Sequence, residues 1–124
     1  MSEPSKSPVS RIGVIMLGVT DLERSIEFYQ DRVGLTMTGK HEGFAFFDGG
    51  EISLALSESL AKTLDGPPGP VEVVFSVEHV RDAHAALVAR GVEFDIEPRS
   101  VTGPMWAANF RDPDGHQLSV FGQA

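Results

Sequence analysis

The chain has 124 residues, 41% of them hydrophobic, and a formal net charge of -8 at pH 7, as expected for one globular domain. Its 10 basic residues form no cluster that could neutralise a nucleic-acid backbone, and the absence of cysteine excludes disulfides, thiolate metal sites and cysteine nucleophiles. No apolar run approaches the ~20 residues of a membrane span, and the first residues lack a signal-peptide core, so we expect a cytoplasmic protein that binds neither nucleic acid nor membrane.

The predicted organisation is a tail followed by two modules. Residues 1–10 hold four serines and two prolines without a periodic apolar pattern, which predicts a disordered tail. We expect 11–124 to form a single domain. A stretch with three prolines and two glycines in its last five residues predicts a linker. The linker covers 57–70, between modules at 11–56 and 71–122.

The first module reads as βαβββ. Alternating apolar residues predict a strand over 12–19. Thr20 and Glu23 have the spacing of a capping box, which predicts a helix that begins at Asp21, and Gly34 is placed to end it. Glycines and charges then separate three apolar runs. These runs predict strands over 35–40, 44–47 and 52–56.

The second module repeats this pattern. A strand is predicted over 72–77 and a helix over 79–90, which stops at Gly91. The run 112–115, Asp-Pro-Asp-Gly, has strong turn chemistry, so its two aspartates are interpreted as structural. Three further strands are predicted over 93–96, 105–111 and 117–121.

The two modules are related by a shift of 58 positions, which carries Val14 onto Glu72 and Val19 onto Val77. Identity between the copies is low, and the similarity lies in the pattern of strand, helix and glycine stop. A chain built from two copies of one unit places its site inside or between the copies. The functional site is therefore expected there.

Two runs carry a resemblance to a known family: VTDLERSIEFYQDRVGL near the start and NFRDPDGHQLSVFG near the end. With the doubled βαβββ layout, they resemble the vicinal oxygen chelate superfamily, which includes glyoxalase I, extradiol dioxygenases, fosfomycin resistance enzymes and bleomycin resistance proteins. The resemblance covers 11–122. It implies an α+β fold in which two βαβββ modules form curled mixed sheets around a cleft, and a chain of this size that pairs as a homodimer.

The resemblance also implies where a metal would bind, because the family takes one ligand from the first and last strands of each module. Those positions are Val14, Ser53, Glu72 and Ser119 in this sequence. Only one of the four ligates strongly, whereas divalent metals need three or more side-chain donors. The four histidines form no metal-binding spacing. We therefore predict no cofactor, with a divalent metal held by other ligands as the alternative.

The alternation of the strands predicts the lining of the cleft. It combines apolar or aromatic side chains with a few polar groups, as ligand pockets do. A core role for Trp106 and a stacking wall for a planar ligand carry equal weight. The predicted ligand-binding residues are Val14, Met16, Ser53, Glu72, Trp106, Asn109, Ser119 and Phe121.

Glu72 is the most informative of these residues. A carboxylate among apolar neighbours is costly to desolvate unless it is paired, which suggests binding of a cation, hydrogen bonding to a polar ligand, or general acid–base catalysis. The alternative is a solvated Glu72, or one that pairs with Arg11, Arg99 or Arg111.

Two functions follow, and the sequence leaves open whether the chain is an enzyme. The first is a metal-free protein that binds an aromatic or cationic small molecule and resembles bleomycin resistance proteins. The second is a glyoxalase-like lyase, isomerase or dioxygenase that uses Glu72 as catalytic base or metal ligand.

Overall fold

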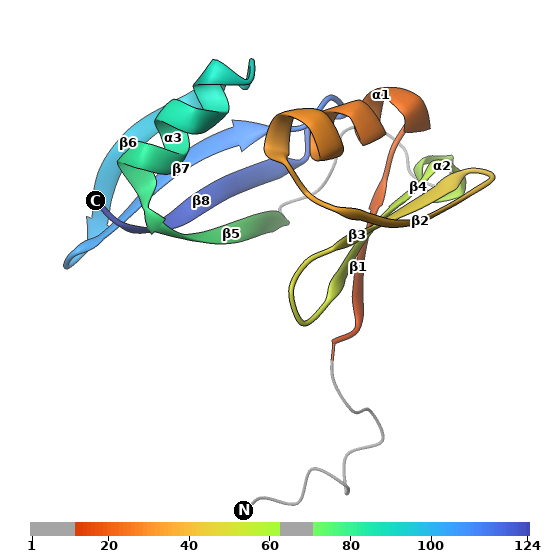
Figure 1. Cartoon of the computed structure of the whole chain (residues 1–124), viewed down its shortest axis with the longest axis horizontal. Coiled ribbons are helices and arrows are strands. Elements are labelled where there is room, and N and C mark those ends of the chain that lie inside the picture. The colour runs from red at the N-terminus through yellow and green to blue at the C-terminus, as the bar shows by residue number, and fades with distance from the viewer. Residues whose placement is uncertain (1–11, 63–70) are drawn as a thin grey trace, which may run out of the picture.

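The chain folds into two four-stranded sheets with the same internal order (Figure 1). The computed structural model describes residues 12–62 and 71–124, so the predicted tail and residues 63–70 of the predicted linker lie outside the described residues. The first sheet has the order β1-β4-β3-β2 and the second β5-β8-β7-β6, with one parallel pair in each, β1 with β4 and β5 with β8. This mixed topology confirms the predicted α+β class.

The bounds of the elements are as follows. The strands are β1 (Val14–Gly18), β2 (Met37–His41), β3 (Phe44–Asp48), β4 (Ser53–Ser57), β5 (Glu72–His79), β6 (Phe94–Thr102), β7 (Met105–Arg111) and β8 (Gln117–Gln123). The helices are α1 (Leu22–Ile26) with its π-helical continuation η2 (Glu27–Val33), α2 (Glu58–Ala61) and α3 (Val80–Ala89). None of the helices in the described ranges is long and apolar enough to cross a membrane.

The first helix begins one residue later than its sequence suggests. Asp21 is the N-cap, and its side chain accepts a hydrogen bond from the backbone N–H of Arg24 at 3.1 Å. The predicted Thr20 cap is wrong, because the Thr20 hydroxyl instead donates to Asp114 of the other module at 2.7 Å. Gly34 ends the helix in the left-handed conformation, with φ of 94°, as predicted.

Of the other two helices, the sequence predicts α3 but not α2. α3 follows His79 and stops before Gly91, whose φ of 94° suits the helix end. α2 lies inside the predicted linker, where the Ser57 hydroxyl caps it by accepting from the N–H of Leu60 at 3.0 Å. A helix of one turn is too short to produce a periodic apolar pattern, so it could not be predicted from periodicity.

β6 is longer than predicted. The sequence favours a strand that stops at Ile96, because Pro98 cannot donate to a strand ladder. The structure continues the strand to Thr102. β6 is one of the two edge strands of its sheet, and an edge strand tolerates proline on its unpaired side.

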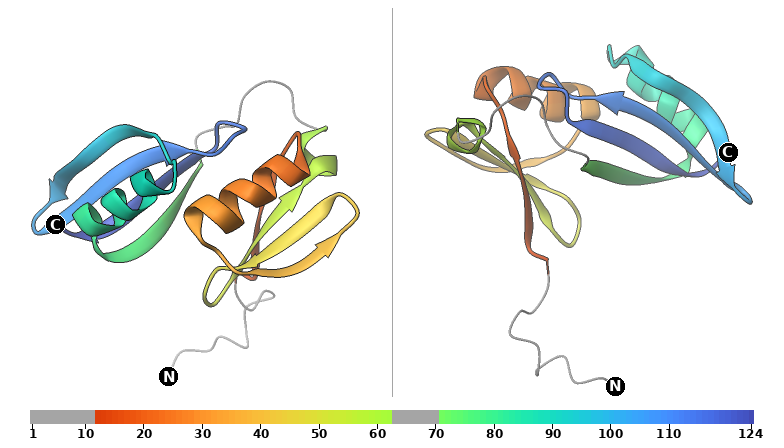
Figure 2. Two further views of the ribbon diagram at one scale, coloured as in Figure 1. Left: turned by 45° about the horizontal axis from the view of Figure 1, so that its top comes forward. Right: turned by 180° about the vertical axis from the view of Figure 1, so that it is seen from behind.

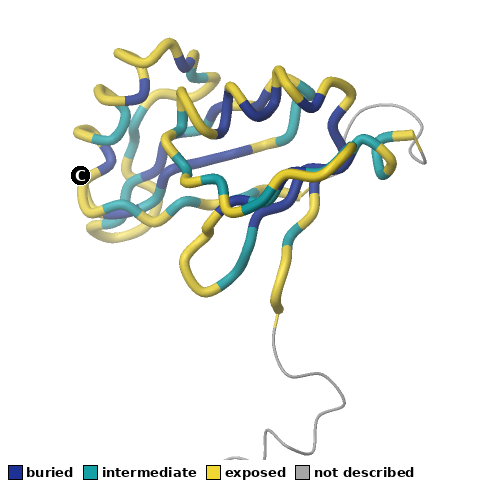
Figure 3. The backbone as a smooth tube through the Cα atoms, turned by 45° about the vertical axis from the view of Figure 1, so that its right-hand side comes forward, coloured by how far each residue is buried: buried dark blue, intermediate teal, exposed yellow. Residues whose placement is uncertain are grey.

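The core lies between the sheets and the helices, and both long helices lie on the same side of the molecule (Figures 1 and 2). Along β1, alternation sends Leu17 toward the helices, and the burial pattern of β5 alternates in the same way from Glu72 to Val77. Figure 3 shows the buried positions gathered where the helices face the sheets. The largest fully buried side chains in the described ranges include Tyr29, Phe47, Phe110, Leu56, Leu118, Val19 and Val80.

Hydrogen bonds tie the first helix to the β7–β8 turn of the other module. Tyr29 donates its hydroxyl proton to Asp112 Oδ2 at 2.7 Å, and the Thr20 hydroxyl donates to Asp114. His116 is partly buried, and its Nε2 lies 2.7 Å from the carbonyl oxygen of Gly18. The aspartates of the turn are therefore structural, as interpreted, and they also join the two modules.

Candidate functional site

The candidate site lies on the faces of the two sheets that point away from the long helices, called here the open faces. Val14 and Met16 of β1 point there, as does Val74 of β5. Their exposed fractions are 47%, 41% and 49%. Exposed aliphatic side chains grouped on one side of a protein are typical of a surface that a ligand or a partner covers, so the open faces are a candidate binding surface.

Small residues in the central strands hollow out the open faces. In the first sheet, Ser53 and Ala55 of β4 lie beside Val14 and Met16. In the second, Ser119 of β8 lies between Val74 and Asn109 and is only 3% exposed. These small residues lower the surface beside Val14, Met16 and Val74.

A chain of hydrogen bonds crosses the open face of the second sheet. Arg99 Nη1 donates to Asn109 Oδ1 at 2.8 Å and to the carbonyl oxygen of Ala107 at 3.0 Å. Asn109 Nδ2 in turn donates to Glu72 Oε2 at 2.7 Å. Because Arg99 can only donate, the amide of Asn109 must present its oxygen to Arg99 and its NH₂ group to Glu72. The network therefore orients the carboxylate of Glu72.

The structure corrects the prediction of a desolvated Glu72. Glu72 is exposed in the single chain, and its hydrogen-bond partner is Asn109. Arg99 does not contact Glu72 in this network but binds Asn109. Arg111, another predicted partner, pairs with Asp95 at 3.0 Å. Arg11 lies outside the described residues. Desolvation of Glu72 therefore requires a ligand or a second subunit to cover it.

A cavity of about 470 Å³ lies between the two sheets, where β1 approaches β5. Its charged residues are Glu72 of β5 and Asp48 at the end of β3, and no basic residue is among the described residues that line it. Sequence reasoning missed Asp48 because it assigned the Asp48–Gly50 run to a turn, and one carboxylate oxygen does accept from the Gly50 N–H at 2.8 Å. The apolar lining residues are Ile15, Leu35, Ile52, Leu54, Val73, Val74 and Phe75.

The structure does not bring every predicted residue together. Phe121 lies on the open face, between Ser76 and Ala107 on the neighbouring strands. Trp106 instead packs against the core on the helix side, where the Arg81 guanidinium carbon of α3 lies 4.4 Å from its ring centroid. The prediction of Trp106 as a wall of the cleft is wrong, because its position in β7 has the opposite parity to that of Asn109.

The metal positions implied by the resemblance come together in pairs. Val14 and Ser53 are direct neighbours in the first sheet, and Glu72 and Ser119 lie on adjacent strands of the second. Their donor set is one carboxylate and two hydroxyls. No group of three His, Asp or Glu side chains suited to a metal exists in 12–62 and 71–124. These residues do not fit a divalent metal site.

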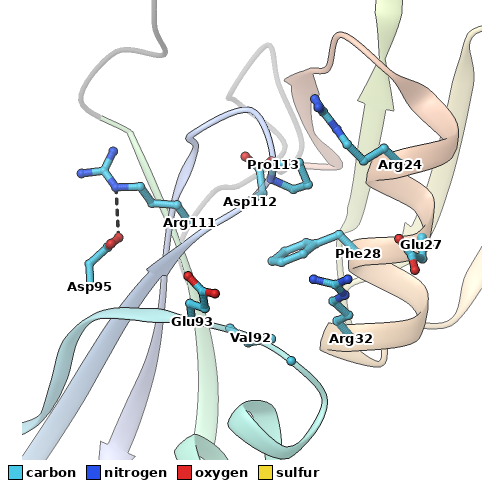
Figure 4. Close-up of a pocket in the computed structure, with 11 residues that line it drawn as sticks. Arg24, Glu27, Phe28, Arg32, Val92, Glu93, Asp95, Arg111, Asp112 and Pro113 are labelled. Atoms are coloured by element: carbon cyan, nitrogen blue, oxygen red, sulfur yellow. Dashed lines mark hydrogen bonds and ion pairs between the residues drawn. The ribbon is translucent and has the colours of Figure 1, made fainter.

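A further cavity, of about 430 Å³, lies on the helix side between the first helix and the second module (Figure 4). The Phe28 ring points into it. Charges of both signs line it, including Arg24, Arg32 and Glu93, and Arg111 is neutralised by its ion pair with Asp95. This mixture gives the cavity no preference for a ligand of one charge.

The fold and the open-faced site define a class of proteins built from two βαβββ modules around a shared cleft. This chain belongs to the Glyoxalase/Bleomycin resistance protein/Dioxygenase superfamily, whose family model matches residues 11–120. The resemblance inferred from the sequence is thereby confirmed.

Three relatives illustrate the breadth of the family. YraH, an uncharacterised protein of Bacillus subtilis (strain 168), is 31% identical in an alignment of 122 residues that covers 86% of this chain and 94% of that protein. A glyoxalase/bleomycin resistance protein/dioxygenase from Nocardioides is 30% identical, with a TM-score of 0.78 over 96% of this chain and 88% of its own. TnmS3, an antibiotic binding protein from Streptomyces sp. CB03234, shares the fold at 24% identity, with a TM-score of 0.78 over 95% of this chain and 99% of its own.

Proposed function

We propose that this chain is a metal-free, cytoplasmic protein that binds an aromatic or cationic small molecule, similar in role to bleomycin resistance proteins. The cavity between the sheets carries the proposal. Its walls are apolar and its described charged residues, Asp48 and Glu72, are both acidic. A ligand with an apolar body and a positive charge would match both features, so the cavity favours a cation over a neutral aromatic compound.

Two further observations support binding as the function. The donor set at the family's metal positions does not suit a divalent ion, and TnmS3, which has the same fold, is an antibiotic binding protein. The exposed aliphatic side chains of the open faces favour a homodimer in which the partner completes the cleft. In such a dimer Glu72 would lose part of its solvent, which would strengthen its attraction for a cation.

Calorimetry against matched cationic, neutral and anionic aromatic compounds tests the proposal. We expect the cationic compounds to bind. The variant Glu72→Gln should weaken their binding roughly 10-fold or more, since a hydrogen bond to a charged group is lost. Glu42→Gln is the control, because it removes an exposed carboxylate that does not line the cavity. No binding by any cation, or equal losses in both variants, would contradict the proposal.

The absence of a metal is part of the proposal and has its own measurement. Elemental analysis of protein purified without a histidine tag should find no stoichiometric iron, zinc, manganese or nickel. A stoichiometric divalent ion would contradict the metal-free proposal and would show that donors besides Val14, Ser53, Glu72 and Ser119 help to hold it.

The second candidate is an isomerase-like enzyme, and the orientation of Glu72 by Asn109 is the observation that favours it. A general base is held in this way before it abstracts a proton. Under this alternative, Glu72→Gln would keep most of the ligand affinity and abolish turnover. The same variant therefore separates the two functions.

A further inference from the structure

A second apolar cavity lies on the helix side, between the end of the first helix and α3, and is called here the helix-side crevice. Its volume is about 420 Å³, within the range of small-molecule pockets. Val33 and Leu35 of the first module form one wall, and the second module supplies the other wall and the floor. The apolar residues from the second module are Phe75, Val77, Ala83, Ala86, Leu87, Phe110 and Val120.

Arg90 is the charged residue among the described residues that line the helix-side crevice. Arg90 is exposed, and within the described ranges its Nη1 donates a long hydrogen bond of 3.5 Å to the carbonyl oxygen of Asp31. No carboxylate of the described chain forms an ion pair with it. Although the chain has a net charge of -8, the Arg90 guanidinium beside this apolar cavity therefore keeps N–H donors that a ligand can use.

Gly34 leaves room for this guanidinium. A Cβ atom at position 34 would lie 2.9 Å from Arg90 Nη1. Gly34 also lines the crevice, so the charged group lies beside the apolar walls rather than away from them. The cavity thus combines apolar walls with one cationic group that has hydrogen-bonding capacity left.

We propose that the helix-side crevice binds an amphipathic carboxylate, with a hydrocarbon or aryl body in the cavity and the carboxylate on Arg90. Guanidinium groups bind carboxylates through paired, charge-assisted hydrogen bonds. Arg90 gives the crevice a preference for a ligand of opposite charge to the one proposed for the cavity between the sheets, although the two cavities share Leu35, Phe75 and Ser76 in their linings. Because its walls come from both modules, an occupant would also stabilise their contact.

Octanoate, octanol and octylamine are the probes, since they share a chain and differ in charge. We expect octanoate to bind by calorimetry and to raise the Tm, with octanol weaker and octylamine weakest. Arg90→Gln should weaken the binding of octanoate roughly 10- to 100-fold and leave the binding of octanol unchanged. Arg81→Gln is the matched control, because this arginine of the same helix stacks on Trp106 outside the crevice.

Ala86→Phe provides an independent test at an exposed position of α3 that lines the crevice. The larger ring should fill the crevice and weaken the binding of octanoate and octanol alike. The variant Arg90→Lys should keep part of the affinity for octanoate. The proposal is overturned if octanoate does not bind, if Arg90→Gln binds it as tightly as the unmodified chain, or if Arg81→Gln loses as much. It is also overturned if octanol binds as tightly as octanoate, which would make the crevice a neutral apolar site.

Discussion

At the scale of single residues, one carboxylate organises the contact between the modules. Asp112 is 5% exposed, and its Oδ1 accepts from the backbone N–H groups of Asp114 and His116 at 3.0 and 2.8 Å. Its other oxygen accepts from Tyr29, which is fully buried in the first helix. Burial raises the pKa of the Tyr29 hydroxyl above its ordinary value of 10.0, and the charge of Asp112 raises that pKa further.

This pKa shift predicts a loss of stability in alkali. The unfolded chain releases the Tyr29 proton near pH 10, whereas the folded chain keeps it. The contribution of the protonated Tyr29 hydroxyl to the free energy of unfolding is therefore complete below pH 10. It falls as the pH rises above 10, by about 1.4 kcal/mol per pH unit. Tyr29 is the single tyrosine, so absorbance at 295 nm reports it alone. Ionisation should coincide with unfolding, and a normal titration in the folded chain would contradict the assignment.

Tyr29→Phe is the companion measurement. It leaves Asp112 without one donor and should lower the free energy of unfolding by about 1–3 kcal/mol near neutral pH. The same variant should lack the part of the alkaline slope that belongs to the tyrosine.

At the scale of elements, close approaches of backbone set how the second sheet bends. The ladder between β5 and β8 is irregular between Ser76 and His79. Opposite this irregularity, a Cβ atom on Gly122 of β8 would collide with the carbonyl oxygen of Val77. Only glycine allows this approach. A similar approach lets α2 lie on β1, where a Cβ on Gly18 would lie 2.9 Å from the backbone nitrogen of Ala61.

Gly122→Ala should therefore destabilise the chain. The obstacle is backbone rather than a movable side chain, so we expect a loss of at least about 1–3 kcal/mol in chemical denaturation. Gly13→Ala is the matched control, because no atom lies within 4 Å of a Cβ there. It should change stability by less than about 0.5 kcal/mol. Equal effects of the two substitutions would show that the approach at Gly122 does not constrain the sheet.

At the scale of the whole molecule, the two sides of the chain differ. One side carries both long helices over the shared core, and the other presents the open faces with their exposed aliphatic residues (Figures 1 and 3). Several exposed aliphatic residues on one side of a molecule are typical of an interaction site. The proposed homodimer would cover this surface and complete the cleft from a second copy.

Val74→Lys should weaken the homodimer. Val74 is 49% exposed on the open face, and Val88 is 48% exposed on α3, so Val88→Lys adds the same charge at the same exposure on the helix side. Sedimentation velocity at micromolar concentration should find the unmodified chain and Val88→Lys as dimers and Val74→Lys as monomer. A monomeric unmodified chain, or dissociation by both variants, would remove the dimer from the proposal.

The sequence by itself determined the fold class, most strand positions, the helix stops at Gly34 and Gly91 and the turn that begins at Asp112. These features depend on residues a few positions apart, whose periodicity and backbone preferences are visible in the sequence. The open-face positions of Val14 and Ser119 were also correct, because they follow from alternation along one strand.

The tertiary structure alone decided what these elements contact. Thr20 meets Asp114 across 94 positions, Glu72 reaches Arg99 through Asn109, and Trp106 faces the helices. Each of these outcomes depends on strand register or on packing between modules, and a shift of one residue in register reverses the face on which a side chain lies. Local preference carries no information about contacts this distant in the chain, so only the assembled sheets could place them.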